Sequence, residues 1–267
     1  MSALHNPFKA ALRGGDPAPR IGLFLGLADP GVAELLGGAG FDWLLIDGEH
    51  GPNDLRTVLA QLRALQGGGA SVLVRVVDHD PARIKQMLDI GVQSLLVPMV
   101  DSAEQARALV RATRYPPAGI RGVGTAMARA ARWNGVPDYL RRADGEICLI
   151  VQAESRAALE ALDEILAVDG VDAVFIGPSD LAASMGHLGS PDHPEVRAAV
   201  LGAIGQIARS GKAAGVFATR LDAARAYGQA GARFIALGTD TLLLRQSAAG
   251  LAQAFRAGAD QAAGTGY

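Results

Sequence analysis

The amino-acid sequence predicts a single (β/α)8 barrel, and three observations favour this fold class. Eight short apolar runs alternate with amphipathic stretches along a chain of 267 residues, a length that suits one large domain or two small ones. The apolar runs are mostly continuous rather than alternating, which is typical of strands covered on both faces of a parallel sheet. No Gly-x-Gly-x-x-Gly follows the first run, so a doubly wound open sheet is the weaker alternative.

The apolar runs are the predicted strands, and the stretches between them are the predicted helices. The strands span residues 20–26, 42–46, 71–76, 94–99, 147–152, 172–177, 213–218 and 233–238. The helices span residues 32–36, 55–65, 81–88, 103–113, 156–166, 194–209, 221–230 and 241–255. Pro81 and Pro194 suit first helical turns, where a missing N–H does no harm, and Asp222 lies near the favourable end of its helix dipole.

A long connection separates the fourth and fifth strands. It runs from Arg114 to Glu146, and connections of this length usually carry function or small helices of their own. We expect it on the C-terminal face of the barrel, where substrates bind. Around the barrel domain, residues 20–257, we predict an N-terminal leader over 1–19 and a flexible Ala/Gly-rich tail over 258–267.

The composition excludes several functional classes. A formal net charge of -2 gives no electrostatic basis for binding nucleic acid or an anionic membrane. The single cysteine, Cys148, lies in an apolar run, so one chain can form neither a disulfide framework nor a thiolate metal site. No apolar run is long enough to span a bilayer, and the N-terminus lacks a signal-peptide core. We therefore expect a soluble cytoplasmic protein.

Two acidic residues follow the fifth and sixth predicted strands. Glu154 and Asp180 would be neighbours in a barrel, where they could bind one divalent cation with waters and substrate oxygens. Oxygen ligands select hard ions such as Mg2+ or Mn2+, and Co2+ is also accepted. The alternative is that each carboxylate caps the helix after its strand, which Asp180 could do for Leu181 onward. The spacing alone leaves both readings open.

Other ionisable residues also follow strand ends. His50, three residues after Asp47, is a candidate general base oriented by a carboxylate, although an ordinary loop histidine would look the same. Arg75 could stabilise an oxyanion, or simply pair with Asp47 or Glu49. Asp89 lies in the last turn of a predicted helix, where the dipole disfavours a carboxylate, so we expect it to have a partner.

The lysines exclude one kind of carbonyl chemistry. A Schiff base needs a lysine in the pocket, but no lysine follows the C-terminal end of a predicted strand; the three are Lys9, Lys85 and Lys212. A barrel of this kind that acts on a carbonyl carbon is therefore expected to use a metal ion.

Four segments, in order, resemble the class II pyruvate aldolases. They are DWLLIDGEH (42–50), LVPM (96–99), RYPPAGIRGVG (114–124) and FIGPSDL (175–181), and the likeness extends over residues 7–255. The resemblance implies a (β/α)8 barrel assembled as a hexamer, with the last helix exchanged between neighbouring subunits. It implies reversible cleavage of 4-hydroxy-2-oxo acids, such as 4-hydroxy-2-oxoheptane-1,7-dioate, to pyruvate and an aldehyde (succinate semialdehyde). It also implies a divalent cofactor, Mg2+, Mn2+ or Co2+.

The resemblance assigns roles position by position. It implies that Glu154 and Asp180 are metal ligands and that Gln152, Ser179, Asp180 and Arg75 contact the substrate. It implies that His50 is the base and that Asp89 raises the basicity of His50. Arg75 would stabilise the transition state, and Asp47 would be a second acidic neighbour of the site. In the implied mechanism, His50 removes the proton from the C4 hydroxyl, directly or through a water, and the C3–C4 bond breaks.

The chain also departs from the family pattern. Phe24 and Phe217 replace a tryptophan and a smaller aliphatic residue, and both are expected to line the aldehyde side of the pocket. Ser179 is shared with 2-keto-3-deoxy-L-rhamnonate aldolases, which keeps a sugar-acid substrate as an alternative. An acyl-CoA lyase would need a basic nucleotide-binding patch, which is not evident here. A catalytically silent barrel that binds oxo acids is the remaining alternative, and the complete residue set argues against it.

Overall fold

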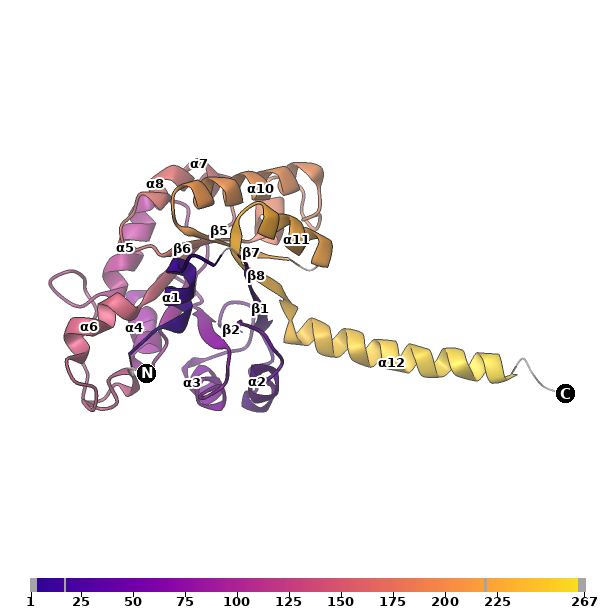
Figure 1. Ribbon diagram of the computed structural model, residues 1–267, viewed down its shortest axis with the longest axis horizontal. Helices are drawn as coiled ribbons and strands as arrows, with labels where there is room; N and C mark the ends of the chain where they lie inside the picture. The colour runs from indigo at the N-terminus through magenta and orange to yellow at the C-terminus, as the bar shows by residue number, and fades with distance from the viewer. Residues whose placement is uncertain (1–3, 17, 219, 264–267) are drawn as a thin grey trace.

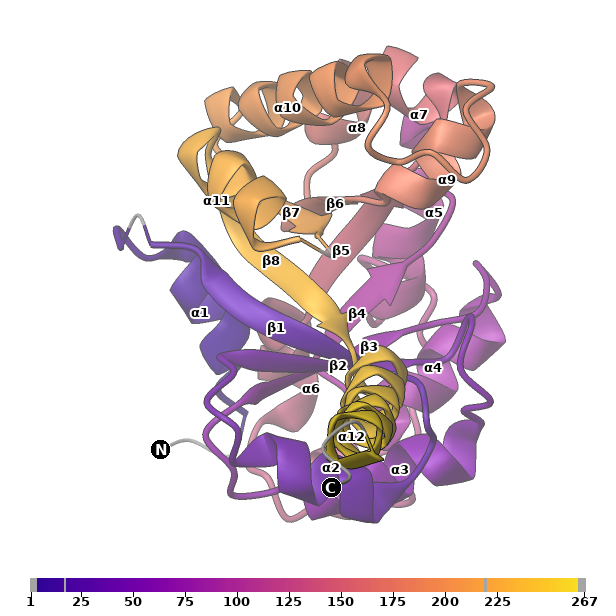
Figure 2. The ribbon, with the colours of Figure 1, turned by 90° about the vertical axis from the view of Figure 1, so that its right-hand side faces the viewer.

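Eight parallel strands form a closed barrel in the computed structural model, which describes residues 4–16, 18–218 and 220–263 (Figures 1 and 2). Each strand pairs with its neighbour in chain order, and β1 pairs with β8. The strands are β1 (Arg20–Leu25), β2 (Trp43–Asp47), β3 (Ser71–Arg75), β4 (Ser94–Val97), β5 (Cys148–Ala153), β6 (Ala173–Ile176), β7 (Ala213–Phe217) and β8 (Ala232–Thr239). The predicted (β/α)8 barrel is confirmed.

Helices surround the barrel and return the chain from each strand to the start of the next. They are α2 (Pro30–Gly37), α3 (Leu55–Ala64), α4 (Pro81–Asp89), α5 (Ala103–Thr113), α7 (Arg156–Glu160), α8 (Leu162–Leu166), α9 (Pro178–Ser184), α10 (Pro194–Arg209) and α11 (Leu221–Gln229). The predicted helix 156–166 is divided into α7 and α8 at Ala161. The short helix α9 was not among the predicted helices, because its seven residues follow β6 directly.

The strands are buried on both faces, as their continuous apolar runs predicted. Side chains that point into the barrel form one cluster, which includes Trp43, Phe175 and Phe234, and none of these three is more than 2% exposed. Alternate side chains such as Leu44 and Ile46 pack outward against the helices. The interior is therefore a packed core, and polar chemistry is confined to the rims.

The predicted N-terminal leader contains a helix that covers the N-terminal end of the barrel. This helix, α1 (Pro7–Arg13), is capped by Asn6 and places Phe8 against Trp43 and Phe234, with ring centroids 6.2 and 5.4 Å apart. Lys9 pairs with Asp172 at 3.2 Å. The polar and Gly-rich residues around α1 hid this apolar face from the sequence reading.

The long connection after α5 lies on the opposite face from the one predicted. It contains η1 (Arg129–Ala131) and α6 (Tyr139–Glu146), so the expectation of small helices is confirmed. Because α5 returns the chain to the N-terminal end of the barrel, the connection packs there, and Arg129 Nη1 donates to Ile90 O at 2.8 Å. The predicted position on the C-terminal face was wrong, because α5 lies between β4 and the connection and carries the chain back to the N-terminal end.

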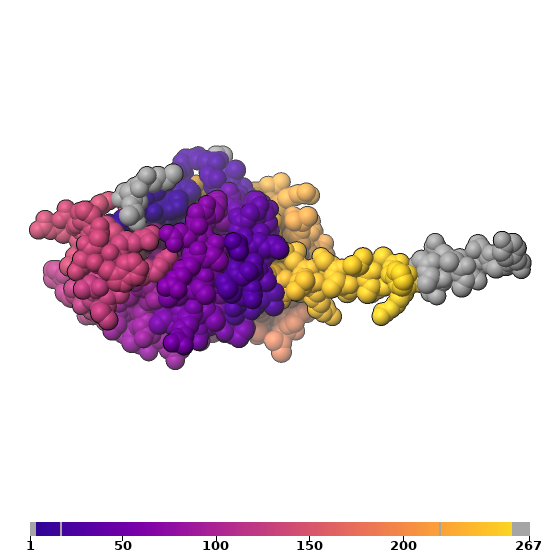
Figure 3. Space-filling model, turned by 90° about the horizontal axis from the view of Figure 1, so that it is seen from below, coloured from indigo at the N-terminus to yellow at the C-terminus, as the bar shows by residue number. Residues whose placement is uncertain are grey.

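The last helix, α12 (Asp240–Ala263), projects away from the barrel as a single rod (Figures 1 and 3). Buried Asp240 fixes its base, because its carboxylate accepts from the N–H groups of Gly26 and Leu27 at 2.8 and 3.1 Å. The predicted tail 258–267 falls partly within this helix and partly, at 264–267, outside the described residues. In the described chain, no helix combines the length and apolar character that a membrane span requires.

Candidate active site and metal centre

Apart from Asp89, the predicted polar site residues lie at the carboxyl ends of β2, β3, β5 and β6. At the first two strands, Asp47 and Arg75 are paired in register. Arg75 donates from Nε and Nη2 to the two carboxylate oxygens of Asp47 at 2.8 and 2.7 Å, and its Nη1 lies 2.7 Å from Glu49 Oε2. Arg75 is only 6% exposed. The ion pairing offered as the alternative for Arg75 is therefore present, and it holds the guanidinium rigidly at the rim.

The pKa values of Asp47 and Glu49 shift in opposite directions, because Arg75 makes two hydrogen bonds to Asp47 and a single ion-pair contact with Glu49. Burial opposes ionisation of Asp47, but the Arg75 hydrogen bonds hold the pKa of Asp47 below its usual value. Burial raises the pKa of Glu49 despite the opposing charge of Arg75. Asp47 is thus a fixed anion that orients Arg75, whereas Glu49 is a weaker acid between Arg75 and His50.

The loop that follows β2 brings His50 to the surface of the rim. Gly48 permits this path, because its N–H donates to Arg75 O at 2.9 Å and a Cβ there would lie 2.7 Å from that oxygen. The His50 side chain is 67% exposed, and its Nε2 lies 3.8 Å from Glu49 Oε2. The imidazole is therefore open to a substrate or a water, with one carboxylate nearby.

At β5, Glu154 is almost completely buried. It is 2% exposed, its Oε1 accepts from Met99 N at 2.9 Å, and Gln152 Nε2 contacts its Oε2. Gly177 leaves room for this carboxylate, since a Cβ there would overlap both Glu154 and Gln152. Burial, followed by the negative charges of Asp180 and Glu49, raises the pKa of Glu154 to about 7.

Asp180 and Ser179 are carried by the first turn of α9, beyond the end of β6. Both are exposed, and the helix is capped by Gly177 without a side-chain hydrogen bond. Likewise the cap of α7 is Ser155, whose side chain accepts from Ala158 N. Neither Glu154 nor Asp180 is the N-cap of the helix that follows its strand, so the alternative that these carboxylates serve as helix caps is wrong for both.

The two carboxylates fit a divalent cation. Their charges repel, Glu154 is buried, and across the described ranges no lysine or arginine forms a salt bridge with either. A cation between them would relieve the repulsion of the two carboxylates and the cost of burying the Glu154 anion. Because both donors are oxygens, the set suits a hard ion such as Mg2+ or Mn2+.

A second group of potential ligands lies in the loop after α9 and the first turn of α10, but it fits an ion poorly. The ligating atoms of His187, His193 and Glu195 lie within 4.8 Å of one another. However, the two imidazoles stack with centroids 3.6 Å apart and planes 16° apart. Lone pairs of stacked rings run parallel rather than converging, so this group is a stacked hydrogen-bonded cluster.

The raised pKa of Glu154 predicts how metal affinity depends on pH. Between pH 4.5, the ordinary pKa of a glutamate, and about 7, its pKa in the fold, Glu154 is protonated in the folded protein, so a cation that uses it as a ligand would have to displace that proton. We expect the Mn2+ dissociation constant to rise about tenfold for each pH unit below 7 and to level off above it. Calorimetric titrations from pH 5.5 to 8 measure this, and a constant affinity across that range contradicts it.

Two aromatic rings form the wall beside Arg75. Phe24 and Phe217 meet edge to face with centroids 5.2 Å apart, and the Arg75 guanidinium carbon lies 5.2 Å from the Phe24 centroid. Phe217 also lines a small hollow with Ser179. The structure thus brings together the residues predicted to face the aldehyde.

Asp89 is the predicted site residue that the fold separates from the others. It lies in the last turn of α4, which runs from the end of β3 back towards the start of β4, so it is at the opposite rim from His50. Its partner is Arg121, whose fully buried guanidinium donates to Asp89 Oδ1 at 2.9 Å. The expected partner for Asp89 is thereby found, but within one protomer it is not His50.

Sequence reasoning missed two contributors. Met99 supplies the backbone N–H that binds Glu154, and it adopts a left-handed φ of 53° to do so. Glu49 was considered only as a possible partner of Arg75, yet it also lies between that residue and His50. A backbone donor leaves no residue-type signal, whereas the acid in the DGEH segment was visible and could have been considered.

Comparison with known proteins gives a consistent result. A family model described as HpcH/HpaI aldolase/citrate lyase matches residues 20–247. An Escherichia coli protein named 4-hydroxy-2-oxo-heptane-1,7-dioate aldolase is 56% identical over 254 residues, covering 95% of this chain and 96% of that protein. A Deinococcus radiodurans protein named hydroxypyruvate/pyruvate aldolase is 60% identical over 256 residues, covering 96% and 92% respectively. The crystal structure of an HpcH/HpaI aldolase/citrate lyase family protein from Burkholderia cenocepacia J2315 matches with a TM-score of 0.89 at 40% identity, covering 94% of this chain and 99% of that one.

Proposed function

The chain belongs to the HpcH/HpaI aldolase/citrate lyase family, and on that premise we propose that it is a carbon–carbon lyase that cleaves 4-hydroxy-2-oxo acids reversibly to pyruvate and an aldehyde. The proposed substrate is 4-hydroxy-2-oxoheptane-1,7-dioate, with succinate semialdehyde as the aldehyde product. The observation that carries the proposal is the buried Glu154, whose pKa is raised by burial and by the charge of Asp180, so that a cation would stabilise both anions. The names of the relatives favour this reading over the sugar-acid and acyl-CoA alternatives.

Glu154 and Asp180 would hold the divalent ion, Mg2+, Mn2+ or Co2+, and this ion would supply Lewis acidity for the charge that develops on the 2-oxo oxygen. Gln152 and Ser179 would contact the substrate. Arg75, held by Asp47, would present a fixed positive charge to the same developing charge, at no reorganisation cost during the reaction.

His50 is the proposed general base, acting on the C4 hydroxyl directly or through a water. Its exposure and its position beside Glu49 support this role. The proposed increase of His50 basicity by Asp89 requires a neighbouring subunit, because the two residues lie at opposite rims of one barrel. Phe24 and Phe217 would face the aldehyde.

Removal of the metal tests the proposed reaction directly. We expect the protein to release pyruvate from racemic 4-hydroxy-2-oxoheptane-1,7-dioate, to lose this activity in EDTA, and to regain it when Mg2+, Mn2+ or Co2+ is restored. A lactate-dehydrogenase-coupled assay measures pyruvate, and hydroxypyruvate should be tried as a second donor in condensation because of the Deinococcus radiodurans relative. Cleavage that persists at full rate in EDTA would contradict the metal-dependent mechanism.

The exposed helix α12 supports the proposal of a hexamer with exchanged last helices. Apolar side chains along its described part are exposed, and Leu251 and Phe255 are 75% and 79% exposed. We expect Leu251→Glu to reduce the assembly to smaller species, as measured by light scattering after size-exclusion chromatography. Gln253→Glu, on the same exposed stretch, adds the same charge and should leave the mass unchanged. An unchanged mass in Leu251→Glu would exclude this helix from the interface.

A further inference from the structure

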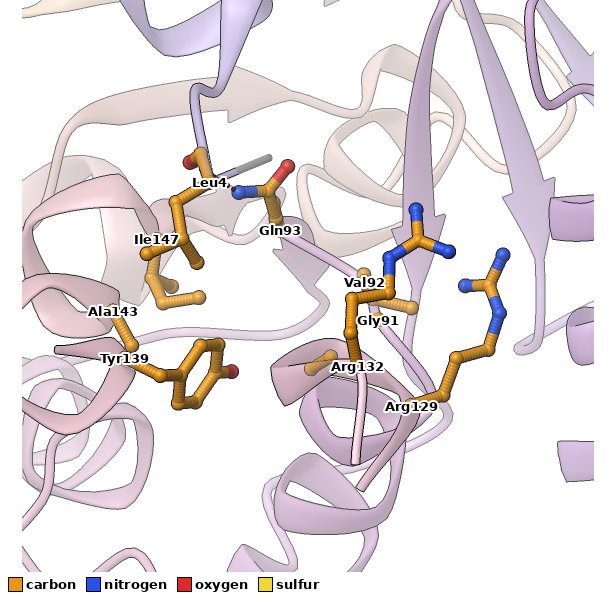
Figure 4. A pocket seen from close by; sticks show the side chains of 10 residues that line it. Leu4, Gly91, Val92, Gln93, Arg129, Arg132, Tyr139, Ala143 and Ile147 are labelled. Carbon is orange, nitrogen blue, oxygen red and sulfur yellow. Dashed lines mark hydrogen bonds between the residues drawn. The ribbon is translucent and has the colours of Figure 1, made fainter. Parts of the chain in front are cut away.

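A small cavity lies at the N-terminal end of the barrel, away from the rim that carries Glu154 and Asp180. It has a volume of about 100 Å³ and lies between the start of β4, η1 and α6. Its polar lining comes from Gln93, Arg129, Arg132 and Tyr139, and the two guanidinium groups point the same way (Figure 4). No carboxylate is among the residues that line it.

The charge around this cavity is unbalanced. In the described chain, neither Arg129 nor Arg132 forms a salt bridge, and the same holds for the nearby Arg63. Burial and then the positive charges of Arg132 and Arg63 lower the pKa of Arg129. Like charges brought together without an acid destabilise the folded chain, and a bound anion removes that repulsion.

The fold fixes the Arg129 side chain and the backbone that carries Arg132. Arg129 Nη1 donates to Ile90 O at 2.8 Å and packs against Gly91, where a Cβ would lie 2.7 Å from that nitrogen. Arg132 has a left-handed φ of 49°, and Trp133 and Asn134 follow with φ of 53° and 67°. Three successive left-handed residues other than glycine persist only where the surroundings impose them, as they do at binding sites. The Arg129 side chain is therefore held in place, whereas the exposed side chain of Arg132 extends from a backbone whose conformation the fold imposes.

We propose that this cavity binds a small anion through the guanidinium groups of Arg129 and Arg132. The ligand class is a phosphate or a small carboxylate, because two guanidinium forks match the planar edges of such groups. The volume decides against a protein segment, since about 100 Å³ holds several waters or one phosphate-sized ion. Occupation would tie the connection 114–146 to the start of β4.

The test compares anion binding to the wild-type protein and three variants, all full-length, at constant ionic strength. Inorganic phosphate and acetate are titrated by calorimetry and by thermal denaturation, with sodium chloride as the balancing salt. We expect saturable binding to the wild type with a rise in melting temperature. Arg132→Gln should weaken binding on the order of tenfold, and Arg132→Lys should recover part of it. Arg107→Gln, which removes an exposed arginine from α5, is the matched control and should bind like the wild type.

Binding of phosphate alone, or of acetate alone, supports the site and identifies its ligand class. Equal affinity in the wild type and Arg132→Gln would overturn the proposal, as would the absence of saturable binding for both anions. A change in oligomeric mass in Arg132→Gln without anion binding in the wild type would also overturn it, because the arginines would then face an acidic group of a second copy.

Discussion

Replacing Glu154 with glutamine is expected to abolish metal-dependent cleavage while stabilising the metal-free protein. Glutamine keeps the size of the side chain but removes one of the two carboxylates proposed to bind the ion. The metal affinity and the stabilisation of the negative charge that develops on the substrate should therefore fall, and the turnover rate should drop by about 10²–10³-fold or more. Above pH 7 the metal-free wild type holds a buried carboxylate anion, whose pKa burial has raised to about 7. Removing that anion should raise the melting temperature there.

The stability gain has a defined pH window, which separates it from a general packing effect. As the pH falls from 7 towards 4.5, the folded protein protonates Glu154, so the advantage of Glu154→Gln should fade across this range. Glu104 is an exposed acid on α5. Glu104→Gln makes the same chemical change without burial and should alter neither the cleavage rate nor the melting temperature. Wild-type cleavage rates in Glu154→Gln at saturating Mn2+ would rule out the ligand role.

The barrel could be predicted from the sequence because burial on both faces leaves a pattern in the residues themselves. Strands such as β2 and β5 are continuous apolar runs whose burial the structure confirms at every position. The N-terminal helix α1 was less visible, since it has only seven residues and its large apolar side chains are only Phe8 and Leu12. The face on which residues 114–146 pack is set by the direction of α5, which precedes them and returns the chain to the N-terminal end of the barrel. That face follows from the order of the elements and not from the residues of the connection itself.

The site could be located because strand ends of a parallel barrel share one rim, which brings Asp47, Arg75 and Glu154 together. The same logic fails for Asp89, because a residue at the end of a helix lies at the other rim. Local caps also resisted prediction: Asp180 occupies the first turn of α9, and Gly177 precedes it as the cap. The distinction between a cap and a ligand depends on backbone torsions, which the residue type does not determine.

Replacing Arg75 with methionine is expected to damage stability and activity together. The side chain is buried, and its removal leaves Asp47 and Glu49 without their shared cation. Breaking a buried ion pair from one side costs about 3–5 kcal/mol, so a marked decrease in the free energy of unfolding should appear in denaturant titrations. Activity should fall by about 10²–10³-fold in the remaining folded protein, because a fixed charge near the reacting oxygen is lost.

A second substitution separates these two effects. In Arg75→Met combined with Asp47→Asn, the buried carboxylate that Arg75 held at 2.7 and 2.8 Å is neutralised, so much of the lost stability should return. Activity should stay low, because an amide and a thioether provide no positive charge for the developing oxyanion. If activity recovers with stability, Arg75 serves only to hold the rim together. If stability recovers alone, the guanidinium acts on the substrate, because its structural role has then been replaced and its chemical role has not.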